Sequence, residues 1–175
     1  MNEHEAAFAE ELREGRVKRL GGVPHNEAPD AVALRLFGLN KWAEENFADL
    51  VFHIHVNDYP RRHRALPGIH TGFAIYVPDR IYANHENSRA AAEYLFSRLK
   101  KVAPVSTYGL ERSGIVLDQE LISLGASRSL SRPALLVEYG YVYERRFAAP
   151  ARAAHLERLA EETYFALLEY FTHRP

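Results

Sequence analysis

The sequence predicts an α/β domain with three layers, in which a mostly parallel β-sheet is flanked by helices. Two observations support this prediction. Segments with helical periodicity alternate with short apolar segments typical of strands, and two of those strands end in side chains able to carry chemistry. With 175 residues, 47% hydrophobic and 26% charged, the chain is expected to form a single domain over residues 1–175.

Helices are predicted where apolar residues recur every three or four positions. The predicted ranges are 2–20, 30–46, 87–101 and 151–171. The first has only a thin apolar stripe that includes Phe8 and Leu12, so residues 1–29 are expected to form a peripheral helix and a loop. Asp30 is a suitable cap for the second helix.

Strands are predicted at 49–56, 72–77 and 134–138, which are short, apolar and rich in β-branched residues. The irregular region from Pro104 to Arg132 is expected to hold one more short strand or turn near residues 114–117. Because sheets usually contain about four to six strands, either this region adds a strand or part of the sheet, at its N-terminal end, is missing from the sequence.

Composition excludes several classes of function. The 22 basic and 23 acidic residues give a formal net charge of −1, which offers no electrostatic basis for binding nucleic acid. No apolar run approaches the length of a transmembrane helix, and the first residues lack the apolar segment of a signal peptide. With no cysteine, any metal ligands must be imidazole nitrogens, carboxylate oxygens or water.

The sharpest local feature is His53-Ile54-His55-Val56-Asn57, near the end of the first predicted strand. Since side chains alternate along a strand, His53, His55 and Asn57 share one face. Two imidazoles at positions i and i+2 lie about 7 Å apart, close enough to bind one ion, and zinc accepts nitrogen and oxygen ligands. The same pattern also fits one buried structural histidine and one surface histidine, so by itself it leaves both interpretations open.

Glu138 is the second candidate. It ends the apolar strand that begins at Ala134 and is followed by Tyr139-Gly140-Tyr141. A carboxylate is seldom buried without a partner, so one placed at the end of a hydrophobic strand is a candidate general base or metal ligand. The alternative is a carboxylate that points into water or pairs with an arginine.

Together these motifs resemble the zinc-dependent N-acetylmuramoyl-L-alanine amidases, which remove peptide from the glycan of bacterial cell walls. The similar segments, in chain order, are Arg35–Asn40, Asp49-Leu-Val-Phe-His-Ile-His55-Val-Asn57, Gly72-Phe-Ala-Ile-Tyr76 and Pro133-Ala-Leu-Leu-Val-Glu138-Tyr-Gly140-Tyr141. The resemblance covers about residues 30–172. The order of the motifs is more specific than any one of them.

The resemblance implies a role for each matching residue. His55 corresponds to a zinc-binding histidine, and Glu138 to the glutamate that activates zinc-bound water. Asn57 would orient a ligand or hydrogen-bond the substrate. His53 stands where the family usually has serine, so it would either support the site or provide a metal ligand of its own.

The resemblance also implies a zinc-dependent hydrolase that cleaves the amide between N-acetylmuramic acid and L-alanine in peptidoglycan. Such an enzyme acts outside the cytoplasm, in the periplasm or the extracellular cell wall. Arg61 and Arg62, in the loop after the histidines, could bind carboxylates of the stem peptide, although a solvated loop explains them better.

One departure from the family leaves alternatives open. The strand ending in Gly-His-Gly and the helix with a ligand glutamate, which together form the family's first half-site, have no counterpart before Asp30. A non-catalytic derivative that binds cell-wall glycopeptide is therefore the main alternative to an active amidase. A metal hydrolase acting on another amide or ester is the third hypothesis.

Overall fold

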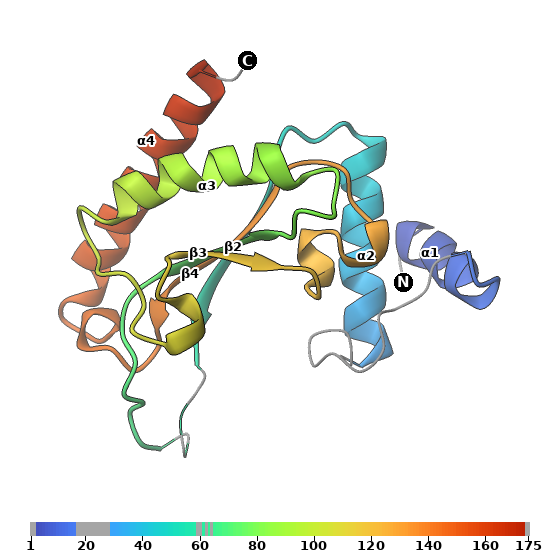
Figure 1. The fold of residues 1–175 in the computed structure, drawn as a ribbon. Helices are drawn as coiled ribbons and strands as arrows, with labels where there is room; N and C mark the ends of the chain where they lie inside the picture. Colours follow the sequence, from blue (N-terminus) through green and yellow to red (C-terminus); the bar gives the residue numbers. More distant parts are fainter. Residues whose placement is uncertain (1–2, 17–28, 59–60, 62, 64, 174–175) are drawn as a thin grey trace. The chain divides into compact units, whose positions relative to one another are not determined.

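The structure is a computed structural model that describes residues 3–16, 29–58, 61, 63 and 65–173 (Figure 1). The described part contains four α-helices: α1 (Glu3–Arg13), α2 (Asp30–Glu45), α3 (His85–Leu99) and α4 (Arg152–His173). Its four strands are β1 (Val51–Asn57), β2 (Ala74–Pro78), β3 (Ile115–Asp118) and β4 (Ala134–Tyr141). Single turns of 3₁₀ helix occur at η2 (Gly109–Glu111), η3 (Ile122–Leu124), η4 (Ala126–Arg128) and η5 (Arg145–Phe147). The predicted α/β class is confirmed, and the irregular region does contribute a strand, β3.

The four strands form one sheet in the order β1-β4-β2-β3, so the last strand in the sequence lies between the first two. β2 and β4 are antiparallel, with Ala74 opposite Glu138. The outer pairs are parallel, because their backbone hydrogen bonds advance in the same direction along both strands. For β1 and β4 these bonds are Val51 N–H to Pro133 O and Val142 N–H to Asn57 O. For β2 and β3 they are Ile75 N–H to Gly114 O and Asp79 N–H to Asp118 O. The sheet is therefore mixed.

The chain divides into two compact units. Unit 1 comprises residues 1–53, 77–88 and 117–135, and unit 2 comprises residues 54–76, 89–116 and 136–175.

The core of unit 1 is formed by aromatic stacking between α1 and α2. The rings of Phe8 and Phe37 are stacked with centroids 4.0 Å apart, and both side chains are buried together with Ala33 and Ile122. The N-terminal helix is thus held by a buried ring, although it is shorter than predicted: it ends at Arg13, and residues 17–20 of the predicted range lie outside the described residues.

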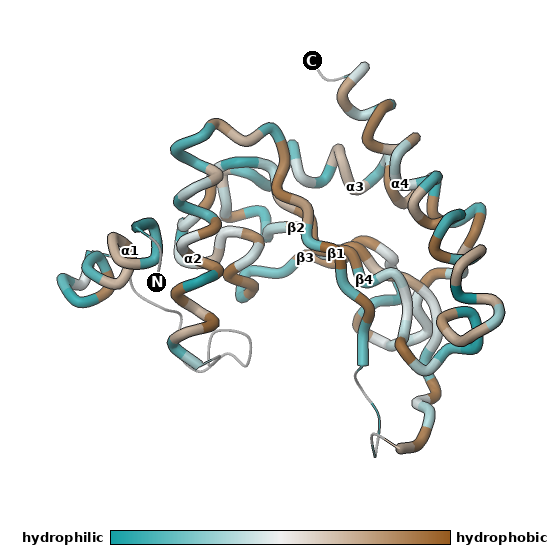
Figure 2. Tube along the Cα trace, turned by 180° about the vertical axis from the view of Figure 1, so that it is seen from behind, coloured by the Kyte–Doolittle hydropathy of each residue, from teal (hydrophilic) through white to brown (hydrophobic). Residues whose placement is uncertain are grey.

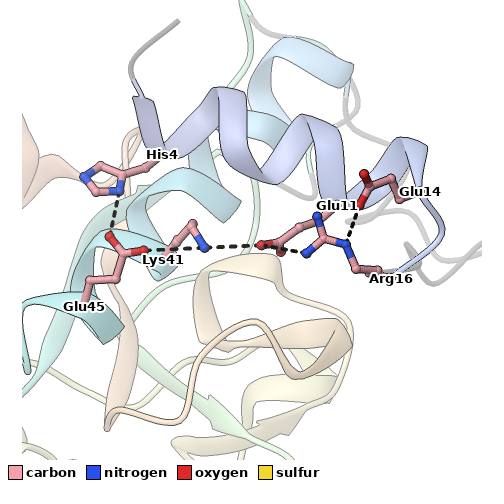
Figure 3. Close-up of polar contacts among 6 residues, drawn as sticks. All are labelled: His4, Glu11, Glu14, Arg16, Lys41 and Glu45. Atoms are coloured by element: carbon pink, nitrogen blue, oxygen red, sulfur yellow. Dashed lines mark hydrogen bonds and ion pairs between the residues drawn. The ribbon is translucent and has the colours of Figure 1, made fainter.

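A chain of polar contacts borders this aromatic core (Figure 3). Lys41 of α2 lies 3.2 Å from Glu11 of α1 and 3.5 Å from Glu45, and His4 lies 3.1 Å from Glu45. The hydrogen bond with Glu11 is the main cause that raises the pKa of Lys41. These ion pairs are partly exposed, so each contributes little to stability compared with the buried rings.

The core of unit 2 surrounds β2 and β4. Phe73, Ile75 and Val137 are fully buried, as are Leu95 and Leu99 on α3. Helix α4 alternates along its length between hydrophobic and hydrophilic residues (Figure 2), as expected for a helix that buries one face. Among the described residues, no helix is both long and apolar enough to span a membrane.

Replacing Phe8 with alanine tests whether the stacked rings or the ion pairs hold α1 in place. We expect the Phe8→Ala variant to lose about 3 kcal/mol of unfolding free energy, because a buried ring is removed and leaves a cavity. The matched Lys41→Ala variant should lose less than about 1 kcal/mol. Trp42, the single tryptophan, lies on α2, so urea denaturation followed by its fluorescence measures both. Equal losses in the two variants would contradict this account.

Candidate active site

The structure brings together the two residues on which the sequence analysis relied most. His55 lies on β1 and Glu138 on β4, which are neighbouring strands. Nδ1 of His55 is 3.7 Å from Oε1 of Glu138. The imidazole is 51% exposed and the carboxylate side chain 15% exposed, so the pair combines a group open to solvent with one that is nearly buried.

The environment of Glu138 favours its neutral form. Oε2 of Glu138 is buried without a hydrogen-bond partner among the described residues. Burial, together with the negative charge of Glu111, raises the pKa of Glu138 to about 7. A carboxylate with this pKa can both accept and donate a proton near neutral pH, which is the property a general acid–base residue needs.

Glu111, in η2, is the main site residue that the sequence analysis missed. It is only 1% exposed. Its Oε1 accepts hydrogen bonds from the hydroxyl of Tyr76 at 2.7 Å and from Nδ2 of Asn57 at 3.4 Å. Its Oε2 accepts from the hydroxyl of Tyr141 at 2.8 Å and from that of Ser106. η2 is a single turn in an irregular region, so no periodicity in the sequence marks this glutamate as buried.

The remaining predicted site residues do not all lie beside this pair. Asn57 is at the end of β1, bonded to Glu111. The guanidinium of Arg61 pairs with Asp58, with Nε 2.7 Å from Oδ1. Arg62 lies outside the described residues. His53 belongs to unit 1, where it lines a cavity of about 330 Å³ together with residues that include Trp42.

The donor set fits a zinc ion only in part. His55 and Glu138 are two possible donors, but the described residues contain no group of three or more histidine, aspartate or glutamate side chains that could hold a metal. A catalytic zinc site in proteins normally has three protein ligands. The described part of the chain therefore does not complete such a site.

An apolar cavity of unit 2 lies away from these residues. It has a volume of about 500 Å³ and is lined by Ile54 and Val56 of β1, by Tyr139, and by residues of α4 such as Leu156 and Tyr164. Because side chains alternate along β1, Ile54 and Val56 project from the face opposite His55. This cavity is therefore not the candidate active site.

Comparison with known proteins shows which fold this is. No protein-family model matches the chain, and no curated protein matches it. Among solved structures, the amidase Ami1 from Mycobacterium smegmatis matches with a TM-score of 0.64 at 15% identity, over 79% of this chain and 61% of that one. Ami1 from Mycobacterium abscessus matches with a TM-score of 0.62 at 16% identity, over 78% and 61%. The chain thus spans about three fifths of the length of the Ami1 chains.

A third structure covers more of both chains. The CwlD amidase from Clostridioides difficile, solved in complex with the GerS lipoprotein, matches with a TM-score of 0.56 at 14% identity, over 97% of this chain and 83% of that one. The sheet and helices that hold His55 next to Glu138 therefore have the α/β fold of the N-acetylmuramyl-L-alanine amidases.

Proposed function

We propose that this protein is a zinc-dependent hydrolase that cleaves the amide between N-acetylmuramic acid and L-alanine in bacterial peptidoglycan. The observation that carries the proposal is the convergence of His55 and Glu138 on neighbouring strands, within a fold shared with peptidoglycan amidases. The substrate places its action in the periplasm or the extracellular cell wall.

In this proposal Glu138 is the proton carrier. Its carboxylate takes a proton from the attacking water as the water oxygen bonds to the lactyl carbonyl carbon. It then gives that proton to the nitrogen of L-alanine as the C–N bond breaks. A pKa of about 7 suits both steps, since the group must ionise to accept the proton and then release it.

His55 and His53 are the proposed zinc-binding histidines, as positions i and i+2 of one strand. Zinc bound there would acidify a coordinated water and polarise the carbonyl. Since the described residues contain no group of three histidine, aspartate or glutamate side chains that could hold a metal, the proposal requires at least one further ligand from outside them.

Asn57, Arg61 and Arg62 are the proposed contacts for the glycopeptide. Asn57 lies next to the pair, two residues beyond His55 on β1. Arg61 is already paired with Asp58, so it would have to share its guanidinium with a substrate carboxylate.

The incomplete donor set favours one other candidate function. A domain that keeps the fold and binds cell-wall glycopeptide without hydrolysing it would need no zinc. The two functions differ in whether purified protein releases peptide from purified cell wall.

The Glu138→Gln variant tests the proposed proton carrier. Because glutamine cannot accept the proton of water, we expect hydrolysis to fall at least about 100-fold while zinc binding is kept. Peptide release is measured by chromatography of digested cell wall, and zinc by elemental analysis. Glu157→Gln, at an exposed position on α4, is the matched control and should retain activity. Loss of zinc from Glu138→Gln would instead make Glu138 a ligand.

The His55→Ala variant tests the metal. If His55 is a ligand, zinc affinity measured by calorimetry should fall roughly 10-fold or more, because a coordinating bond is lost. His63→Ala removes an exposed histidine and should leave the affinity unchanged. Equal affinities for His55→Ala and the wild type would refute the assignment.

The pKa of Glu138 also predicts how stability changes with pH in the metal-free protein. Burial raises this pKa from 4.5 to about 7, so the folded state favours the protonated carboxyl. The wild type should therefore lose stability as the pH rises from about 4.5 to 7, by on the order of 2–3 kcal/mol.

Glu138→Gln, which carries no charge, should lack this loss. It should unfold at a higher temperature than the wild type at pH 8 and at a similar temperature at pH 4.5. Calorimetry at the two pH values measures the difference, and identical pH profiles for the two proteins would show that Glu138 is not buried in this way.

A further inference from the structure

Four side chains donate hydrogen bonds to the carboxylate of Glu111, and we call them the Glu111 cage. Three of them come from different strands of the sheet. Asn57 is the last residue of β1, Tyr76 lies on β2, and Tyr141 ends β4. Ser106 adds a fourth donor from the segment before η2. Three neighbouring strands are therefore tied to one carboxylate, although they are far apart in the sequence.

Burying the carboxylate of Glu111 costs free energy of hydration. Among the described residues, no lysine, arginine or histidine forms an ion pair with Glu111 that would offset the burial of its charge. Four hydrogen bonds must therefore compensate for lost hydration. An apolar side chain of the same volume often stabilises an interior as well as a buried charge does, so stability alone is a weak reason for a glutamate here.

Two of the donors stand directly beside the candidate catalytic pair. Ala74 is opposite Glu138 in the β2–β4 register, and Tyr76 projects from the same face two residues later. In the same way, Asn57 follows His55 by two residues on β1. Burial and the hydrogen bond with Glu111 are the main causes that raise the pKa of Tyr76, and the charge of Glu138 adds to them, as expected for groups that face each other.

Glu111 also determines which atom Tyr76 offers to a ligand. A tyrosine hydroxyl has one proton, and Tyr76 gives it to Glu111 at 2.7 Å. The phenol oxygen then presents only lone pairs, so it can accept a hydrogen bond but not donate one. A ligand recognised at this position must supply an N–H or O–H group.

We propose that Glu111 is a positioning residue that holds Tyr76 and Asn57 as a wall beside His55 and Glu138, with the Tyr76 oxygen turned to accept a hydrogen bond from an amide N–H of the substrate. This inference rests on the proposed function and adds a recognition element to the same site. Glu111 acts through its two neighbours and takes no proton itself.

The test compares Glu111→Gln with Glu144→Gln. Glu144 is the matched control, because it is another buried glutamate of unit 2, 6% exposed, but its Oε1 accepts from the backbone N–H groups of Gly72 and Tyr141. A glutamine at 111 keeps the shape, but its amide NH₂ cannot accept hydrogen bonds as the carboxylate oxygen did. At least one pair of donors must therefore turn away.

The first readout needs no ligand and no metal. In the free protein, we expect the NMR signals of the Tyr76 ring and the Asn57 side-chain amide to shift in Glu111→Gln and to stay in place in Glu144→Gln. Unchanged signals in Glu111→Gln would overturn the positioning role. A comparable shift in both variants would overturn it as well, since that outcome indicates a general loss of packing.

The second readout is the affinity of metal-free protein for N-acetylmuramoyl-L-alanine, measured by NMR titration. We expect a loss of roughly 5-fold or more in Glu111→Gln and in Tyr76→Phe, and no greater loss in the double variant, because residues acting through one contact are not additive. Additive losses would overturn the inference.

The two readouts separate this inference from the proposed function. If the wild type does not bind N-acetylmuramoyl-L-alanine, the proposed function fails, and the signals of the free protein still decide whether Glu111 positions its neighbours. If the wild type binds and Glu111→Gln binds equally well, the inference fails and the proposed function stands.

Discussion

The burial of two carboxylates in one unit is the constraint on which the polar architecture of this protein depends. A buried carboxylate stays ionised only when its surroundings compensate for lost hydration, because removing a charged group from water costs several kcal/mol. Glu111 is compensated by four hydrogen-bond donors. Glu138 is not: one of its oxygens has no partner among the described residues, and the charge of Glu111 acts against its ionisation. The difference leaves one carboxylate held by four hydrogen bonds and the other close to its titration midpoint at neutral pH.

The order of the strands brings the residues of the candidate site together. β4 lies between β1 and β2, so Glu138 has His55 on one side and Tyr76 on the other. β1 is the parallel neighbour of β4 and β2 is its antiparallel neighbour. Ala74 of β2 lies opposite Glu138, and this register puts the side chains of Tyr76 and Glu138 on the same face of the sheet. The apolar face of β1 is directed elsewhere, toward α4, which keeps the packing of that helix separate from the chemistry.

The likeness to solved amidases concerns the fold, at identities of 14–16%. At this divergence the site must be argued from its own atoms. Those atoms support a general acid–base glutamate beside an exposed imidazole. They supply fewer metal donors than a catalytic zinc normally uses, so the proposed zinc-dependent hydrolysis would need donors beyond the described residues.

The sequence by itself determined the elements whose residues carry a local pattern. Apolar periodicity placed α2 and α4 within a few residues of their observed bounds. The short apolar segment rich in β-branched residues predicted a strand over 49–56, and β1 spans residues 51–57. The sequence also marked His55 and Glu138, since both lie at or near the end of a predicted apolar strand. It did not show that β4 continues to Tyr141, because that extension lies beside the end of β1, where Val142 N–H bonds Asn57 O. Only the tertiary structure placed Glu111 next to the site residues, because its partners Asn57, Tyr76 and Tyr141 come from three different strands. Residues so far apart in the sequence leave no local pattern around Glu111.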